Sequence, residues 1–207
     1  MSDKKKSLKR NLIEWGVIIG IFGILFATGL HTEVIGRLQQ VILWTGLRQP
    51  DISIPEREQT QANYNMLLSD FDGNTVALSR YKGDVIFINF WASWCPPCVA
   101  EMPSIQNLYN SVADNEHIKF ALISLDENPE DAQQFIERRG FDMPVYFLAS
   151  GVPDSFYSQT VPTTFVVSPD GDIVAQKKGL AKYNTKRFRN FLLSLAEQAE
   201  TLSNQSG

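Results

Sequence analysis

The sequence has few of the side chains that usually build metal centres, with two cysteines and two histidines among 207 residues. A tetrahedral zinc site needs four ligands, and His31 and His117 fall in separate segments of the chain, away from the cysteines. We therefore expect both histidines at solvent or interface positions, and we predict no metal and no other cofactor. Internal repeats and low-complexity tracts are also missing. The mixture of apolar and charged residues in the middle of the chain predicts one globular domain with a core.

Positive charge is scarce outside the first ten residues. Those residues carry a net charge of +4, which leaves −8 for the remainder of a chain whose total is −4. Proteins that bind nucleic acid present basic surfaces to the phosphate backbone. The acidic remainder therefore argues against a nucleic-acid partner.

One long apolar run follows the basic start. Residues 12–30 contain a single charge, Glu14, and as a helix this segment would rise about 28 Å, close to the thickness of the bilayer's hydrocarbon core. With a basic tail at residues 1–11 on the cytoplasmic side, it predicts a single transmembrane anchor in contact with the lipid bilayer. A cleaved signal peptide is the alternative. The uncleaved anchor is favoured because no small-residue cleavage site follows Leu30, where the chain continues His-Thr-Glu.

Residues 31–62 are interpreted as an amphipathic helix followed by a linker. Apolar residues recur at helical spacing within 33–47, but Arg37 and two glutamines interrupt them, so the stretch is too short and too polar to cross a bilayer easily. If it did cross, the following domain would be cytoplasmic. Pro50, Pro55 and many polar residues mark the linker.

The two cysteines, Cys95 and Cys98, follow an apolar, β-branched stretch at residues 85–90 that is typical of a buried strand. A helix beginning near Cys95 would place both thiols in its first turn, where unpaired N–H groups and the helix dipole favour the thiolate. Pro96 and Pro97 suit that turn. The alternative is a structural disulfide, but a bridge that closes so short a loop constrains little of the unfolded chain. The pattern therefore favours redox chemistry.

The remaining pattern alternates strands and helices, which predicts βαβ units and a parallel central sheet. The predicted elements are a hairpin of strands 64–68 and 75–78, strand 119–125, helix 129–139 ended by Gly140, strand 145–148, a second hairpin of strands 164–167 and 173–176, and an amphipathic helix 185–202.

The stretch NFWASWCPPC followed by EMP resembles the active site of thioredoxin-like proteins, most closely the membrane-anchored TlpA/ResA type of thiol-disulfide oxidoreductase. Trp94 to Cys98 match the family's WCxxC motif, Pro103 matches its helix-kinking proline, and Val161-Pro162-Thr163 match its cis-proline loop. The resemblance covers roughly residues 63–200. It implies a thioredoxin-like α/β fold over residues 63–202, with an N-terminal β-hairpin and a central insertion.

The resemblance also implies roles for individual residues. Cys95 would attack, Cys98 would resolve the mixed disulfide, and Val161 and Pro162, joined by a cis peptide bond, would face the cysteines and pair with a substrate chain. Trp94 would shield the thiols or touch the partner. The buried aspartate of thioredoxin falls on Asn89, which cannot titrate. Glu101, one helical turn beyond Cys98, matches the acidic residue of ResA-type proteins and is the expected acid/base, unless it is only a solvated helix glutamate.

By resemblance, the expected function is the reduction of protein disulfides outside the cytoplasm, for example in cytochrome c maturation. The chain would sit in a bacterial cytoplasmic (inner) membrane with its domain on the periplasmic or outer side. Its partners would be protein thiols and disulfides and an upstream membrane electron donor. A disulfide oxidant or isomerase is one alternative, because the motif does not fix the direction of exchange. A redox-inactive binding module is another.

Overall fold

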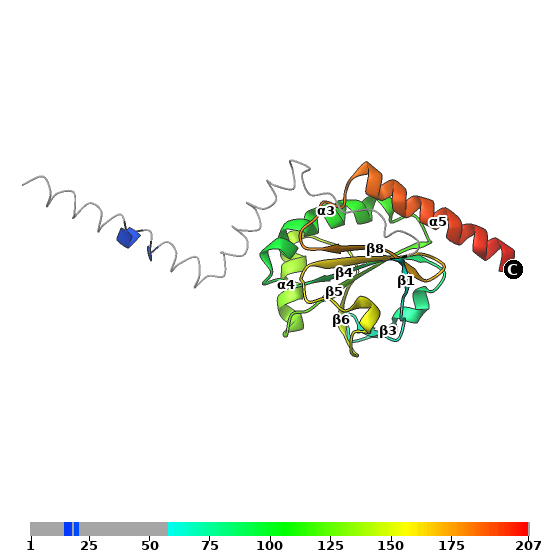
Figure 1. The fold of residues 1–207 in the computed structure, drawn as a ribbon. Helices are drawn as coiled ribbons and strands as arrows, with labels where there is room; N and C mark the ends of the chain where they lie inside the picture. Colours follow the sequence, from blue (N-terminus) through cyan, green and yellow to red (C-terminus); the bar gives the residue numbers. More distant parts are fainter. Residues whose placement is uncertain (1–14, 18, 21–57, 207) are drawn as a thin grey trace, which may run out of the picture.

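The computed structural model describes residues 15–17, 19–20 and 58–206 (Figure 1). Its strands are β1 (Thr60–Gln61), β2 (Leu67–Ser69), β3 (Thr75–Ala77), β4 (Val85–Trp91), β5 (Ile118–Ser124), β6 (Val145–Leu148), β7 (Thr163–Val167) and β8 (Asp172–Lys178). Its helices are α3 (Pro96–Val112), α4 (Pro129–Arg139) and α5 (Lys186–Ser206), with two short 3₁₀ turns, η2 (Leu78–Tyr81) and η3 (Asp154–Phe156).

All eight strands form one mixed sheet in the order β1-β8-β7-β4-β5-β6-β2-β3. At its centre β4 pairs with β5 and β5 pairs with β6, both in parallel. The α3 and α4 crossovers make these parallel pairs possible. The predicted parallel core and the two predicted hairpins are therefore confirmed, with β2–β3 and β7–β8 antiparallel.

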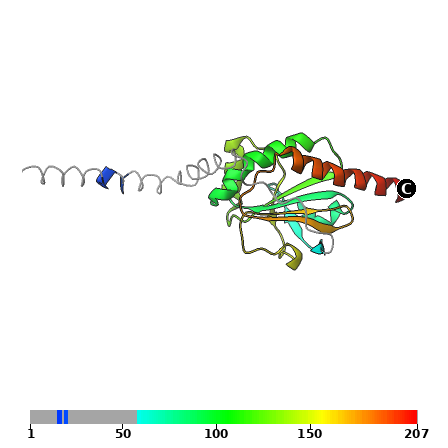
Figure 2. The ribbon, with the colours of Figure 1, turned by 45° about the horizontal axis from the view of Figure 1, so that its top comes forward.

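Strand β4 separates two apolar cores, because its side chains alternate between the two faces of the sheet. Phe87 and Trp91 pack with residues of α3, α4 and α5 in one core, and Ile86, Ile88 and Phe90 pack in the other. Figure 2 shows α3 and α5 lying along the same face of the sheet. The second core is covered by the β2–β3 hairpin and η3 instead of a long helix. All seven residues of β4 are buried, which explains its continuously apolar sequence.

Two predicted boundaries are corrected by the structure. The predicted linker extended through residue 62, but Thr60 and Gln61 form β1 and pair with Ile173 and Asp172 of β8. The predicted strand 64–68 begins only at Leu67. Strand β1 is held by β8, which is distant in the sequence and leaves no local apolar pattern. Residues 64–66 precede the paired part of the β2–β3 hairpin and form no strand.

Most of the predicted N-terminal organisation lies outside the described residues. This includes the basic tail at residues 1–11, the amphipathic helix and the linker up to residue 57. Of the predicted anchor at residues 12–30, the structure describes 15–17 and 19–20, which are helical. Within the described part of the chain, no helix combines the length and the apolarity needed to cross a bilayer.

Candidate active site

The two cysteines are joined by a disulfide at the start of α3, with a Cα–Cα distance of 5.2 Å. Cys95 is the N-cap residue, and its sulfur accepts a hydrogen bond from the Cys98 backbone N–H at 3.3 Å. Pro96 and Pro97 occupy the first two helical positions, as expected from their missing N–H groups. This geometry directs a helix N-terminus at the Cys95 sulfur, which stabilises a thiolate there once the disulfide is reduced.

The two cysteines differ only slightly in exposure. Cys95 is 4% exposed and Cys98 is fully buried, so Cys95 is the cysteine that solvent reaches. Trp94, in contrast, is 58% exposed. Its ring is therefore available to a partner protein and is not part of the core.

The cis-proline loop lies against Cys95. The Val161–Pro162 peptide bond is cis, as the resemblance implies, and the Val161 carbonyl oxygen lies 3.8 Å from the Cys95 sulfur. The Pro162 carbonyl accepts a hydrogen bond from the Gly179 N–H at 2.8 Å, which ties the loop to the end of β8. The structure thus brings together Cys95, Cys98, Val161 and Pro162 from segments more than sixty residues apart.

Glu101 is fully buried, which rules out the reading of a solvated helix residue. Its Oε1 accepts a hydrogen bond from Asn89 Nδ2 at 2.9 Å, and its Oε2 accepts one from the Ala181 N–H at 3.2 Å. Desolvation raises the pKa of Glu101 from 4.5 to about 8, although both hydrogen bonds act to lower it. Near neutral pH this carboxyl group can therefore both release and accept a proton.

Glu101 belongs to a larger buried polar network. Asn89 also donates to Thr164 Oγ1 at 2.8 Å, and the Tyr183 hydroxyl donates to the same oxygen at 2.6 Å. Asn89 and Thr164 lie opposite each other in the β4–β7 pairing, which explains their contact. Burial, and secondarily the charge of Glu101, raise the pKa of Tyr183 well above 10. Sequence reasoning identified Asn89 but missed Thr164 and Tyr183.

Asp126 is a further residue that the sequence analysis missed. Its carboxylate accepts hydrogen bonds from the Ser93 N–H at 3.0 Å and from the Ser93 hydroxyl at 2.7 Å, and it also accepts one from Ser124 at 2.7 Å. These bonds fix the loop that carries Trp94 and leads into Cys95. A usable signal was present, because Ser124 ends β5, which is parallel to β4, and Asp126 follows it by two residues. The ends of parallel strands meet at one edge of a sheet.

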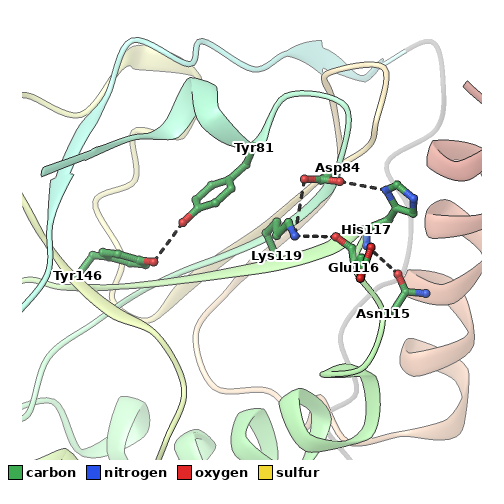
Figure 3. Close-up of polar contacts among 7 residues, drawn as sticks. All are labelled: Tyr81, Asp84, Asn115, Glu116, His117, Lys119 and Tyr146. Atoms are coloured by element: carbon green, nitrogen blue, oxygen red, sulfur yellow. Dashed lines mark hydrogen bonds and ion pairs between the residues drawn. The ribbon is translucent and has the colours of Figure 1, made fainter. Parts of the chain in front are cut away.

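His117 lies at the opposite end of the strands from the cysteines. Its Nδ1 is 3.2 Å from Asp84 Oδ1, and Lys119 Nζ is 4.0 Å from the other oxygen of Asp84 (Figure 3). Asp84 and His117 directly precede β4 and β5, whereas Cys95 follows the far end of β4. This histidine therefore cannot share a site with the cysteine pair.

A central mixed sheet, a cysteine pair at a helix N-terminus and a cis-proline opposite it together define a thioredoxin-like protein. The sequence profile of the Redoxin family matches residues 46–190, and the chain belongs to this family. The match begins before residue 63, where the sequence analysis placed the start of the domain.

Curated relatives include thiol-disulfide oxidoreductases named ResA. The protein from Oceanobacillus iheyensis is 33% identical over 130 residues, which cover 62% of this chain and 66% of the relative. The protein from Bacillus subtilis is 31% identical over 111 residues, which cover 53% and 62%. The chain thus matches slightly less than two thirds of the length of these relatives.

Solved structures show the same fold at lower sequence identity. StoA from Bacillus subtilis superposes with a TM-score of 0.51 at 24% identity, covering 60% of this chain and 93% of StoA. A secreted thiol-disulfide isomerase from Corynebacterium glutamicum superposes with a TM-score of 0.56 at 22% identity, covering 70% and 90%. These similarities support the thioredoxin-like α/β architecture.

Proposed function

We propose that this protein is a thiol-disulfide oxidoreductase that reduces protein disulfides through Cys95 and Cys98. The observation that carries the proposal is the position of the Cys95 sulfur, at a helix N-terminus and 3.8 Å from the carbonyl of the cis-proline loop. The relatives named ResA are thiol-disulfide oxidoreductases, and similarity to them supports the same activity here.

The reaction transfers two electrons from the dithiol to a substrate disulfide. The Cys95 thiolate attacks one substrate sulfur, forms a mixed disulfide and displaces the other substrate sulfur as a thiolate, which takes up a proton. Cys98 then loses its proton and attacks the Cys95 sulfur. This step releases the second substrate thiol and leaves the Cys95–Cys98 disulfide that the structure contains. Two protein thiols are oxidised for each substrate disulfide reduced.

Glu101 is the proposed acid/base for these proton transfers. It lies one helical turn beyond Cys98 on α3, and its pKa of about 8 lies close to the ordinary pKa of a thiol. A carboxyl group so matched can take the Cys98 proton before the second attack and return a proton afterwards. No other carboxylate of the described residues is fully buried.

The reducing direction and the location complete the proposal. The apolar run at residues 12–30 after a basic tail supports a membrane anchor with the domain on the outer side of a bacterial cytoplasmic membrane. Each turnover of such a reductase converts its dithiol to a disulfide. A membrane electron donor must therefore restore the dithiol. Extracytoplasmic thiol pathways such as cytochrome c maturation would supply its protein substrates.

The thiol roles are tested by trapping. Cys98→Ala should accumulate mixed disulfides with substrate proteins, because the resolving thiol is gone, whereas Cys95→Ala should trap almost none. Non-reducing electrophoresis of both variants beside the wild type gives the measurement. Equal trapping by the two variants would contradict the assignment of Cys95 as the attacking thiol.

The location is tested separately by labelling. A membrane-impermeant thiol reagent added to intact, pre-reduced cells that express the chain should modify Cys95. The Cys95→Ala variant gives the background signal. Modification only after lysis would place the domain in the cytoplasm and favour a second crossing by residues 33–47.

A further inference from the structure

Basic side chains gather in one segment of the domain. Residues 58–206 contain eleven Lys and Arg against eighteen Asp and Glu, and six of the eleven lie within residues 177–189. This segment runs from the end of β8 into the first turn of α5 and contains no Asp or Glu. The six residues are Lys177, Lys178, Lys182, Lys186, Arg187 and Arg189. Positive charge is therefore concentrated in one part of an otherwise acidic domain.

These six side chains are not neutralised within the domain. Among residues 58–206, none of the six takes part in a salt bridge or a side-chain hydrogen bond. Four of the other five basic residues do have contacts there: Lys82 with the Tyr64 ring, Lys119 with Asp84, Arg138 with the Gln134 carbonyl and Arg139 with the Phe135 ring. The charge of residues 177–189 is therefore available to an anion from outside the domain.

A polar hollow of about 360 Å³ lies between α3 and α5, and two of the six basic residues, Lys186 and Arg189, line it. Ammonium and guanidinium groups form strong, charge-assisted hydrogen bonds with phosphate oxygens. Sites of about 300–1,000 Å³ hold small molecules, so the hollow has room for a phosphate-bearing group. Its other lining residues carry neutral amide or hydroxyl groups: Asn107, Ser111, Asn184 and Thr185.

Helix α3 brings no negative charge to this surface. Its one charged residue is Glu101, which is fully buried. The N–H groups of Ala181 and Tyr183 donate hydrogen bonds to side chains of α3, each at 3.2 Å, which places Lys182 beside that helix. We call the following three residues the α3–α5 basic surface: Lys182, Lys186 and Arg189.

The proposed anchor at residues 12–30 would keep an anionic surface within reach. The 29 residues between this anchor and β1 span at most about 100 Å. A domain tethered in this way stays at a high effective concentration beside the bilayer. Each Lys or Arg that comes close to anionic lipids strengthens binding by about fivefold, so a few such residues are enough to hold a tethered domain.

We propose that the α3–α5 basic surface docks the domain on anionic phospholipid headgroups of the membrane that holds the anchor, with a headgroup phosphate in the hollow. The inference rests on the anchor in the proposed function, and it does not require the thiol chemistry. Asn107 lies twelve residues beyond Cys95, which is about 18 Å along a helix. Docking at the hollow therefore leaves the reactive end of α3 open to a protein substrate.

The test places the full chain in nanodiscs of phosphatidylcholine alone, or of phosphatidylcholine with an equal part of phosphatidylglycerol. A water-soluble reagent acetylates the lysines, and mass spectrometry gives the rate at each one. In the anionic discs, acetylation of Lys182 and Lys186 should slow by about fivefold or more. Salt at about 1 M, which shortens the Debye length to about 3 Å, should restore both rates. Lys82 is the internal control, because it lies over the Tyr64 ring against the other core, and its rate should be the same in both discs.

Charge reversal tests the same surface directly. The double variant Lys186→Glu with Arg189→Glu should lose the protection of Lys182 in anionic discs. Arg80→Glu with Arg138→Glu is the matched control, because it makes the same change in net charge at two exposed residues elsewhere on the domain. This control should keep the wild-type protection. Equal wild-type acetylation rates in the two kinds of disc, or undiminished protection in the Lys186→Glu with Arg189→Glu variant, would overturn the inference.

The remaining outcomes separate this inference from the proposed function. A chain that co-purifies with neither kind of nanodisc would refute the anchor and the docking together. Protection of Lys182 by added polyglutamate in phosphatidylcholine discs, with none from phosphatidylglycerol, would assign the surface to an acidic protein and overturn the inference. Failure of the wild type to reduce hydroxyethyl disulfide in the same discs would refute the thiol chemistry, while the acetylation rates would still decide the docking.

Discussion

Glu101 shows how burial can outweigh hydrogen bonding in setting the chemistry of a single residue. Two N–H donors contact its carboxylate, and both favour the charged form, yet the pKa rises to about 8 because no solvent reaches the group. Thioredoxin-like proteins with an aspartate on the central strand have a titrating group at the position of Asn89. Here Asn89 instead orients the carboxyl group of α3.

Replacing Glu101 by Gln should separate its titration from its shape. A charged Glu101 disfavours thiolate on the adjacent cysteines, so Glu101→Gln should lower their apparent pKa values. It should also slow exchange by about 10- to 100-fold if the carboxyl group transfers the proton. Thiol-alkylation rates against pH, together with turnover of a peptide disulfide, measure the two effects.

The exposed α5 residue Glu197 provides the control, and Glu197→Gln should behave as the wild type. If the pH profile and the turnover of Glu101→Gln both coincide with those of the wild type, Glu101 has only a structural role. The proton would then have to come from water.

The sequence predicted the residues near the cysteines better than it predicted their partners. The motif around Cys95 and Cys98 and the spacing to Glu101 are local, and so is the X-Pro pair that forms the cis peptide bond. The burial of Glu101 is not local, because it depends on Ala181, eighty residues further along the chain. Thr164 contacts Asn89 because β7 pairs with β4, and Tyr183 in turn contacts Thr164. Neither contact can be predicted from neighbouring residues in the sequence.

At the level of elements, the sequence predicted a helix that has local signals at both ends and missed a strand that is held by a distant pairing. Helix α4 was predicted with its observed bounds, with Gly140 as its end. In the structure Gly140 adopts the left-handed conformation with φ of 63°, and Asn128 caps the start of the helix. Strand β1 was missed, because its two exposed residues are held by β8, more than a hundred positions away. A pairing of that kind leaves no apolar alternation to detect.

Gly140 offers a test of this interpretation of α4. A Cβ at this position would meet no atom within 4 Å, so the cost of Gly140→Ala is that of the left-handed backbone alone. We expect a loss of about 1–2 kcal/mol in the free energy of unfolding, measured by urea denaturation.

Gly151→Ala is the matched control for that measurement. Gly151 also has open space around it but lacks a positive φ, so its replacement should leave stability unchanged or raise it by up to about 1 kcal/mol. Equal effects of the two substitutions would show that the C-cap conformation does not limit the choice of residue at 140.

The whole molecule is coupled to the ionisation of Glu101, because its carboxyl group lies where α3, β4 and the segment after β8 meet. The pKa of Glu101 is about 8 in the folded protein, against an ordinary value of 4.5. The folded state therefore holds this proton more tightly than the unfolded state does. The resulting stabilisation of the folded state is fully present below pH 4.5, falls as the pH rises from 4.5 towards 8, and is lost above about pH 8.

We therefore predict that the oxidised wild-type protein loses about 3–5 kcal/mol more stability between pH 5 and pH 9 than the oxidised Glu101→Gln variant does. Every other titrating group is common to the two proteins, so subtracting the two pH dependences isolates Glu101. Urea unfolding at both pH values, with the disulfide kept intact, provides the four free energies. A ¹³C NMR titration of the Glu101 carboxyl group should show the same midpoint near pH 8. Parallel pH dependences, or a midpoint near 4.5, would mean that water reaches this carboxyl group and that it cannot serve as a proton store for the cysteine pair.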